Sequence, residues 1–229
     1  MTSTAILIPA RYNSSRFPGK PLTLLDGVPM VKRVYNACKA TGLPTYVLTD
    51  DMRVFEQFDA RACWIDQERE YANGTERCAG AVANDMFTKY CGHYDQFINV
   101  QGDMPDVTVE MIERVKSIIP QSGVSTAWTE MKKSLQSDPN TVKLVHNNVY
   151  AHWFGRGMTY GSQHLGIYGY TRRALSRYPI YKQSQHENLE NLEQLRWIDN
   201  YWRIAVTKVD FNGIEINTPE DMEKWNDSR

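Results

Sequence analysis

The sequence lacks the features that mark several large classes of protein. Its 229 residues contain four cysteines, none in a C-x-x-C pair, so we expect reduced cytosolic thiols rather than disulfides or a zinc site. No apolar run approaches the roughly 18 residues that span a bilayer. The N-terminus has no basic start, long apolar stretch and small-residue cleavage site of a signal peptide. We therefore expect a cytoplasmic protein with no membrane insertion.

An excess of charge of either sign is also missing. The chain has 26 basic and 27 acidic residues and a formal net charge of −1. Such a balance attracts neither nucleic acid nor anionic lipid, so a bound anion has to be held by a local cluster of cations. We expect no nucleic-acid partner. A hydrophobic content of 41%, without repeats or linkers, predicts one domain over residues 1–229, with room for a modest sub-lobe.

Short apolar runs alternate with segments of helical spacing in the first half of the chain. Strands are predicted at 4–8, 45–49, 62–65 and 96–100. Between and after them, apolar residues recur at helical spacing, among them Val31, Val34, Tyr35 and Cys38; Cys78, Ala79, Val82 and Met86; and Ile112, Val115 and Ile119. This alternation predicts an α/β fold with a Rossmann-like, mostly parallel sheet and helices on both of its faces.

The pattern changes after about Gly123. Predicted strands at 124–131, 142–146, 149–153 and 165–170 have few helices between them, so we expect an inserted β-rich lobe at approximately 124–170. Within it, His146-Asn147-Asn148 suits a hairpin turn, since Asn tolerates positive φ. Further on, the spacing of Leu189, Leu192 and Leu195 predicts a helix that packs through leucines. Thr218-Pro219-Glu220-Asp221 predicts the start of a last helix.

A cation-rich loop follows the first predicted strand. It has the sequence P-A-R-Y-N-S-S-R-F-P-G-K-P from Pro9 to Pro21, and Arg11, Arg16 and Lys20 place three cations within ten residues, beside the hydroxyl of Ser14. Ligands of α/β folds bind at the carboxyl ends of strands, and a triphosphate needs several fixed donors. The loop therefore predicts a phosphate site, with a solvated basic loop as the alternative. It is neither a Walker loop nor G-x-G-x-x-G.

A carboxylate follows the predicted strand at 96–100, in the sequence Gln101-Gly102-Asp103. Sequential strands of such sheets usually lie close together, which brings Asp103 near the cation-rich loop. A carboxylate there suits a magnesium ion that bridges phosphates. Taken alone, Asp103 is explained equally well as a turn or helix-capping acid.

Five segments in this order resemble the 3-deoxy-manno-octulosonate (Kdo) cytidylyltransferase family, and they cover nearly the whole chain: the loop from Pro9 to Pro21, Asn73-Gly74-Thr75-Glu76-Arg77, Val100 to Pro105, His164 to Tyr170, and Leu192 to Arg196. The resemblance implies an α/β fold of the nucleotide-diphospho-sugar transferase type. It also implies a homodimer that uses CTP and Mg²⁺, makes CMP-Kdo and releases pyrophosphate for lipopolysaccharide synthesis. The first loop is shared with CMP-sialic acid synthetases, whereas H-L-G-I-Y-G-Y and L-E-Q-L-R favour Kdo.

The resemblance also implies roles for individual residues. It assigns the CTP phosphates to Arg11, Ser14, Arg16 and Lys20, the cytidine to Gly74, Thr75, Arg77 and Gln101, the sugar acid to Arg156, His164, Tyr168, Glu193 and Gln194, and magnesium to Asp103 and the position of Asn217. Arg11, Arg16, Lys20 and Asp103 form its catalytic set. Arginine can pair with a carboxylate as a planar fork, which fits Arg156. In isolation, His164 is better explained as a satisfied strand histidine and Glu193 as part of a solvated helix face.

Three positions depart from the family pattern. Met104 stands where the family usually has Glu, and Asn217 where it usually has Asp as the second magnesium ligand. An amide oxygen still coordinates magnesium but without a full negative charge, so we expect metal binding to survive in a weakened form. Gly155 replaces a Ser before Arg156, and only residues 157–163 separate Arg156 from His164. The exact sugar acid is therefore left open.

Three other functions remain as alternatives. The same chemistry can act on an 8-amino Kdo analogue or a sialic-like acid, which competition between sugar acids would distinguish. A glycosyltransferase usually needs an Asp-x-Asp motif, which Gln101-Gly102-Asp103 does not supply, and it releases no pyrophosphate. A module that binds CTP without turnover is the non-enzymatic alternative, suggested by Met104 and Asn217. In the expected reaction, the anomeric hydroxyl attacks the α-phosphorus of CTP, and no residue stands out as a general base.

Overall fold

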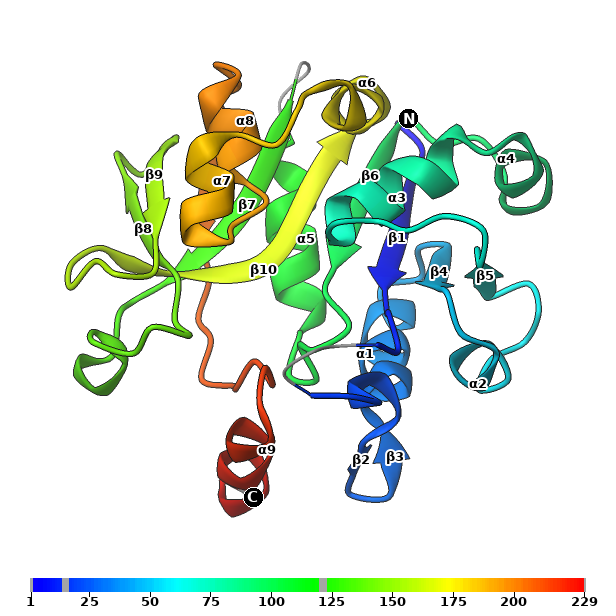
Figure 1. Cartoon of the computed structure of the whole chain (residues 1–229), viewed down its shortest axis with the longest axis horizontal. Helices are drawn as coiled ribbons and strands as arrows, with labels where there is room; N and C mark the ends of the chain where they lie inside the picture. Colours follow the sequence, from blue (N-terminus) through cyan, green and yellow to red (C-terminus); the bar gives the residue numbers. More distant parts are fainter. Residues whose placement is uncertain (1, 14–16, 120–122, 229) are drawn as a thin grey trace.

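The computed structural model describes residues 2–13, 17–119 and 123–228. Within these residues, one mixed sheet of nine strands runs through the molecule (Figure 1). Seven strands follow one another in the order β11 (Ile204–Lys208), β7 (Val124–Thr129), β10 (Ser162–Thr171), β6 (Gln96–Val100), β1 (Thr4–Pro9), β4 (Thr45–Thr49) and β5 (Cys63–Ile65). The other two, β8 (Lys143–His146) and β9 (Ala151–Gly155), extend from β10.

Most neighbouring strands of the main path are parallel. β1 pairs in parallel with β4 and β6, β4 with β5, and β7 with β11. β10 is antiparallel to both of its neighbours, β6 and β7. The predicted α/β fold with a mostly parallel sheet is confirmed. The segment 124–170 supplies two strands of the main path, β7 and most of β10, and the hairpin β8–β9, whose turn contains Asn148 at φ 69°.

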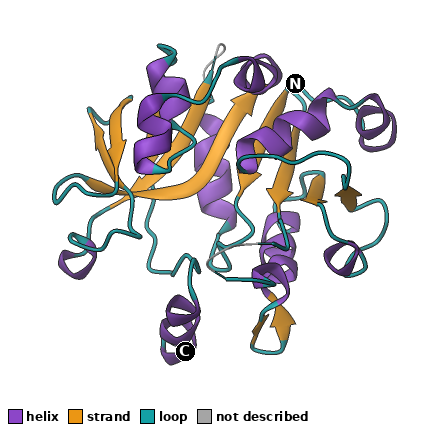
Figure 2. Ribbon diagram, viewed as in Figure 1, coloured by secondary structure: helices purple, strands orange, loops and turns teal. Residues whose placement is uncertain are grey.

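Helices cover both faces of the sheet, and Figure 2 shows them beside the strand layer. Side chains alternate along β1: Ala5 and Leu7 join one buried cluster, whereas Ile6 and Ile8 join the other. The first cluster packs under α3 (Gly74–Ala83), α4 (Asp85–Cys91), α6 (Arg172–Arg177) and α8 (Leu195–Asp199), and the second under α1 (Met30–Lys39), α2 (Met52–Phe55) and α5 (Val109–Ser117). A strand buried on both faces explains the continuous apolar run at 4–8.

Shorter elements and the last helix of the chain complete the fold. They are the 3-10 turns η1 (Lys20–Leu22), η2 (Lys133–Leu135) and η3 (Tyr178–Ile180), the two-residue strands β2 (Leu24–Leu25) and β3 (Val28–Pro29), α7 (Gln185–Glu190) and α9 (Pro219–Asp227). The predicted start of α9 is confirmed, since Thr218 and Asp221 form a capping box. Trp225 of α9 packs with Met30 and Ile216, which fixes the segment before α9 beside α1.

Two helix predictions were wrong because asparagines interrupt the apolar periodicity. Met86 does not share a face with the buried residues of α3, and it is 47% exposed. The Asn84 side chain accepts hydrogen bonds from the backbone N–H groups of Met86 and Phe87, so a new helix, α4, starts there. Leu189 likewise does not pack with Leu192 and is 74% exposed. Asn191 adopts a left-handed conformation, φ 53°, and ends α7.

The structure also describes the cysteines and the apolar character of the helices. All four cysteines lie in the described part of the chain and are free thiols. Within residues 2–13, 17–119 and 123–228, no helix combines the length and the apolar character needed to cross a membrane.

Candidate active site

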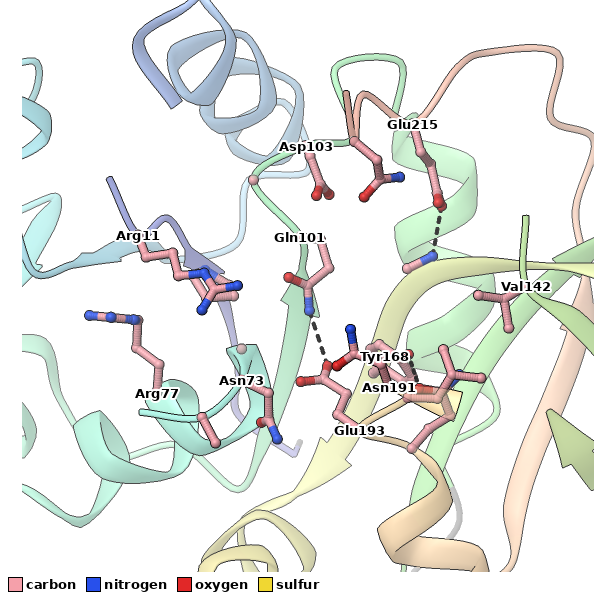
Figure 3. A pocket seen from close by; sticks show the side chains of 18 of the residues that line it. Arg11, Asn73, Arg77, Gln101, Asp103, Val142, Tyr168, Asn191, Glu193 and Glu215 are labelled. Carbon is pink, nitrogen blue, oxygen red and sulfur yellow. Dashed lines mark hydrogen bonds between the residues drawn. The ribbon is translucent and has the colours of Figure 1, made fainter. Parts of the chain in front are cut away.

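A cavity of about 330 Å³ lies where β1 and β6 end and α3 begins. Its size is in the range of small-ligand pockets. Twelve of the residues assigned from the sequence line it: Arg11, Lys20, Gly74, Arg77, Gln101, Asp103, Arg156, His164, Tyr168, Glu193, Gln194 and Asn217. Figure 3 shows Arg11 and Arg77 on one side, Asp103 and Glu215 on another, and Glu193 and Tyr168 opposite them. Ser14 and Arg16 lie outside the described residues.

The cation-rich loop is held at the cavity by the neighbouring strand β4. Ala10 N donates to Leu48 O at 2.8 Å, and the Thr49 hydroxyl donates to Ala10 O at 2.8 Å. Tyr12 N donates to the Asp50 carboxylate at 3.2 Å. Three contacts from β4 and the residue after it therefore fix where the loop leaves β1.

Asp103 joins three segments at the edge of the cavity. Its carboxylate lies 2.6 Å from the Lys20 ammonium, which links β6 to the cation-rich loop. Its backbone carbonyl accepts a hydrogen bond from Ile216 N at 2.9 Å, which brings Asn217 to the same cavity. The predicted proximity of Asp103 to the loop is confirmed, and among the described residues its carboxylate pairs with Lys20.

Glu215 is a cavity carboxylate that sequence reasoning missed. Gly166 N donates to Glu215 Oε1 at 2.9 Å, where the pairing of β10 with β7 shifts its register. Burial raises the pKa of Glu215 to about 7, the Gly166 N–H acts in the opposite direction, and the charge of Asp103 raises the pKa further. The available signal in the sequence was that Glu215 lies two residues before Asn217, a position that the resemblance assigns to the site.

Gly74 allows α3 to approach β6 closely. A Cβ at Gly74 would lie 2.8 Å from Gln101 Nε2, so a larger residue would displace Gln101. Gln101 Nε2 in turn donates to Glu193 Oε1 at 3.2 Å. Thr75 does not line the cavity: its N–H donates to Glu193 Oε2 at 3.1 Å, and its hydroxyl lies 2.9 Å from the Tyr170 hydroxyl. Thr75, which the resemblance assigns to the cytidine, therefore lies behind the cavity wall in the structure.

Two buried donors in the cavity wall lack a partner among the described residues, Arg77 Nη1 and Gln194 Nε2. The other terminal nitrogen of Arg77 pairs with Asp50 at 2.7 Å, and the amide oxygen of Gln194 accepts from the Tyr168 hydroxyl at 3.2 Å. Buried donors without a partner are rare in folded proteins and each calls for an explanation.

Glu193 accepts two hydrogen bonds but forms no ion pair in the part of the chain that the structure describes. Burial raises its pKa to about 7, against the lowering effect of the Thr75 N–H, and the negative charge of Glu187 adds to the rise. Glu193 therefore exchanges a proton near neutral pH, in contact with Gln101.

Replacement of Glu193 by Gln should flatten the pH dependence of stability. Between the unfolded pKa of about 4.3 and the folded pKa of about 7, the folded protein keeps a proton that the unfolded chain has released. The free energy of unfolding therefore falls as the pH rises through this window, and the Gln variant lacks this contribution. Urea unfolding from about pH 5 to about pH 7 measures the effect, and parallel curves for the two proteins would contradict it.

His164 is buried, and its Nε2 lies 3.0 Å from the Thr126 hydroxyl. Burial lowers the pKa of His164 to about 3, and the positive charge of Arg156 contributes. The imidazole is therefore neutral at physiological pH. Arg156 Nη1 donates to Asn140 O at 2.9 Å and to Pro139 O at 3.3 Å, and the Arg156 backbone N–H donates to Glu190 at 2.8 Å.

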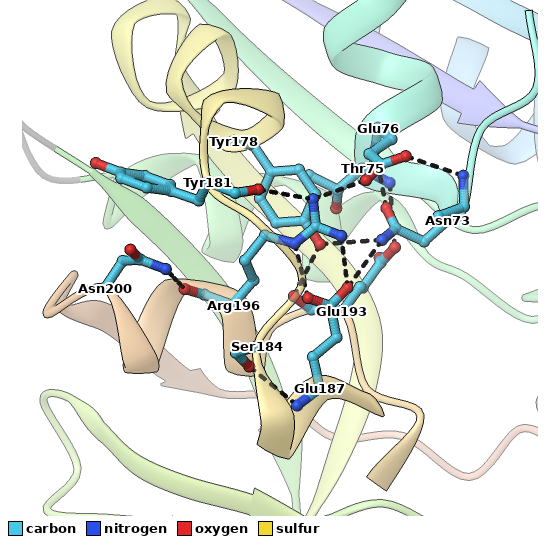
Figure 4. Close-up of polar contacts among 11 residues, drawn as sticks. Asn73, Thr75, Glu76, Tyr178, Tyr181, Ser184, Glu187, Glu193, Arg196 and Asn200 are labelled. Carbon is cyan, nitrogen blue, oxygen red and sulfur yellow. Dashed lines mark hydrogen bonds and ion pairs between the residues drawn. The ribbon is translucent and has the colours of Figure 1, made fainter. Parts of the chain in front are cut away.

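A buried arginine ties the Glu193 side of the cavity to the start of α3 (Figure 4). Arg196 pairs with both oxygens of Glu187 at 2.7 Å and with Glu76 of α3 at 2.7 Å. Its guanidinium also lies 4.2 Å from the centre of the Tyr178 ring. Asn73, which caps α3, donates to the Tyr178 hydroxyl at 3.0 Å. The network fixes the two walls relative to each other.

The sheet order and the cavity at the strand ends define the class: this is an α/β nucleotidyltransferase fold. A family profile described as Cytidylyltransferase matches residues 5–206. The chain belongs to the cytidylyltransferase family, and it is an enzyme of the nucleotidyltransferase class.

Individual relatives agree with this assignment. The 8-amino-3,8-dideoxy-manno-octulosonate cytidylyltransferases of Shewanella sp. (strain ANA-3) and Shewanella oneidensis are each 36% identical over 242 residues, which covers 97% of this chain and 96% of theirs. A solved structure of CMP:2-keto-3-deoxy-manno-octonic acid synthetase complexed with CTP has a TM-score of 0.84 and 31% identity, over 99% of this chain and 98% of that one. The resemblance to Kdo cytidylyltransferases is thereby confirmed. A 4-diphosphocytidyl-2C-methyl-D-erythritol synthase from Anaerococcus prevotii shares the fold, at TM-score 0.64 and 12% identity.

The donor set around Asp103 fits a magnesium ion. In the parts of the chain that the structure describes, no three His, Cys, Asp or Glu side chains form a metal cluster. Magnesium is usually held by one or two carboxylates together with substrate phosphates, and Asp103 with the amide of Asn217 corresponds to that arrangement.

Proposed function

We propose that the enzyme transfers CMP from CTP to Kdo or its 8-amino analogue and releases pyrophosphate. One observation carries the proposal: a single cavity contains a cationic end at Arg11 and Lys20, and an end with Arg156 and Glu193. The first end suits a triphosphate, and the second a hydroxylated acid. The relatives, a CMP-Kdo synthetase complexed with CTP and 8-amino-Kdo cytidylyltransferases, support the same pair of substrates.

The cationic end binds the nucleotide. Arg11 and Lys20 pair with the phosphates, and Arg16 and Ser14 of the same loop complete the set. Arg77 and Gln101, which line the cavity beside Gly74, bind the cytidine.

The other end binds the sugar acid. The guanidinium of Arg156 pairs with the carboxylate of the sugar, since a planar fork matches a planar carboxylate. Hydroxyl groups of the sugar bond to Glu193, to Gln194 and to the neutral imidazole of His164, while Tyr168 orients Gln194 through its hydroxyl. Glu193 also contacts Gln101, so it connects the nucleotide and sugar ends.

The chain's own residues then act by positioning and by neutralising charge. The anomeric hydroxyl of the sugar attacks the α-phosphorus of CTP, and pyrophosphate leaves in line. Lys20 and Arg11 stabilise the negative charge that moves onto the departing pyrophosphate. Asp103 and Asn217 would hold magnesium, which would supply further charge neutralisation at the phosphates.

The resemblance extends the proposal to the biological setting. We place the enzyme in the cytoplasm as a homodimer that makes an activated sugar acid for lipopolysaccharide. Sedimentation of the purified protein tests the oligomeric state: a single species of about 26.4 kDa would contradict the dimer.

Replacement of Asn217 by Asp should strengthen metal binding roughly tenfold, because a full negative charge replaces an amide oxygen. Mn²⁺ titration in the presence of CTP, followed by electron paramagnetic resonance, measures the affinity. Asn212→Asp, in an exposed loop of the same segment, adds the same charge away from the cavity and is the matched control. Equal affinity in the two variants would remove Asn217 from the metal site.

Pyrophosphate release from CTP and Mg²⁺ tests the substrate assignment. Kdo, its 8-amino analogue and a sialic acid are compared as acceptors, with a reaction without acceptor as the control. We expect release with Kdo or its 8-amino analogue at a kcat/KM far above that with sialic acid. Release independent of the acceptor, or its absence with both octulosonates, would refute the assignment.

A further inference from the structure

Lys143 of β8 is a lysine without exposed surface. Its ammonium donates to two backbone carbonyls, Asp138 O at 2.6 Å and Arg156 O at 2.8 Å. Across the described ranges no carboxylate forms an ion pair with it. Among the described residues, its direct hydrogen-bond acceptors are therefore these two peptide carbonyls.

A buried ammonium with this environment is costly to keep. Removing the charge from water is unfavourable, and carbonyl groups offset that cost only in part. Burial accordingly lowers the pKa of Lys143, and the nearby charge of Arg156 lowers it further, against Asp138 and Glu190, which raise it. An apolar side chain of similar volume would fill the same space without this penalty. Packing alone therefore does not explain why a lysine occupies this position.

Both carbonyls belong to segments that meet at Arg156. The turn that starts at Asp138 supplies the two carbonyls that accept from Arg156 Nη1, those of Pro139 and Asn140. Lys143 binds the first residue of this turn and the backbone of Arg156 itself. The turn and Arg156 are thus joined twice, once through the guanidinium and once through the Lys143 ammonium.

We propose that Lys143 is a positioning residue for the sugar acid: it fixes Arg156 against the 138–140 turn. The inference rests on the proposed role of Arg156. Lys143 itself touches no substrate, because it has no exposed surface and does not line the cavity. Its removal should therefore affect the sugar acid and not the nucleotide.

The test is a double-mutant cycle on pyrophosphate release. Lys143→Met should raise the KM for the sugar acid about tenfold, with the KM for CTP and kcat changed less than about twofold. Lys133→Met, an exposed lysine of the same connection, is the matched control and should leave both constants unchanged. In an Arg156→Ala background, Lys143→Met should add no further increase.

Several outcomes would overturn the inference. They are an unchanged KM for the sugar acid in Lys143→Met, an equal rise in both KM values, or effects of Lys143→Met and Arg156→Ala that multiply. Should Lys143→Met not fold, Lys143→Gln, which keeps a hydrogen-bond donor, is measured in the same cycle against the same criteria. Failure of the proposed function is distinct, since the unmodified enzyme would then release no pyrophosphate with an octulosonate.

Discussion

Asp103→Asn should lower kcat for pyrophosphate release by roughly 100- to 1,000-fold, with the fold intact. The substitution keeps the shape of the side chain and removes the charge that pairs with Lys20 at 2.6 Å. In the proposed reaction that carboxylate positions Lys20 and would hold magnesium, so its loss should weaken the stabilisation of charge in the transition state more than it weakens CTP binding. Steady-state kinetics at saturating CTP and sugar acid measure kcat directly.

A matched control separates the role of Asp103 from a general effect of charge. Glu110→Gln removes one carboxylate on α5, where the side chain is 68% exposed and its arginine partner is 3.6 Å away. We expect this variant to retain the kcat of the unmodified enzyme. An Asp103→Asn enzyme within about threefold of the unmodified kcat would exclude Asp103 from the reaction.

Arg196→Met should destabilise the protein by about 3–5 kcal/mol, which corresponds to a fall in Tm of roughly 10 °C for a chain of this length. The substitution leaves Glu187, itself buried, without the guanidinium that now pairs with both of its oxygens. It also frees Glu76 and uncovers the face of the Tyr178 ring. Calorimetry and urea unfolding give the two quantities.

Two further variants identify the cause of this loss. Arg114→Met removes an arginine that is 58% exposed and should change stability by less than about 0.5 kcal/mol. Combining Arg196→Met with Glu187→Leu removes the unpaired carboxylate and should recover part of the loss. A double variant that is less stable than Arg196→Met by the full cost of a second core substitution would contradict this explanation. The uncompensated charge of Glu187 would then not be the cause of the loss in Arg196→Met.

The parts of the fold that follow from local sequence could be predicted. β1 is apolar from Ala5 onward because both of its faces are buried, and β6 is buried from Phe97 to Val100. The ends of the two strands therefore locate the cation-rich loop and Asp103 without a structure. The Lys20–Asp103 contact follows from two neighbouring parallel strands that end at the same edge of the sheet.

The errors arose where a single side chain overrides periodicity. Asn84 and Asn191 end or restart helices through a cap and a left-handed backbone, which apolar spacing does not reveal. The interactions of Glu215 and Arg196 were beyond sequence reasoning for another reason. Each depends on partners far away in the chain, Gly166 for Glu215 and Glu76 for Arg196, and only the folded structure brings them together.

The most direct test of the central claim is ³¹P nuclear magnetic resonance of a reaction with CTP, Mg²⁺ and an octulosonate. The proposed transfer yields one phosphodiester signal from a CMP–sugar conjugate together with an equal amount of free pyrophosphate. CTP that persists unchanged, or CDP or inorganic phosphate formed in place of the conjugate, would contradict a cytidylyltransferase acting on this class of sugar acid.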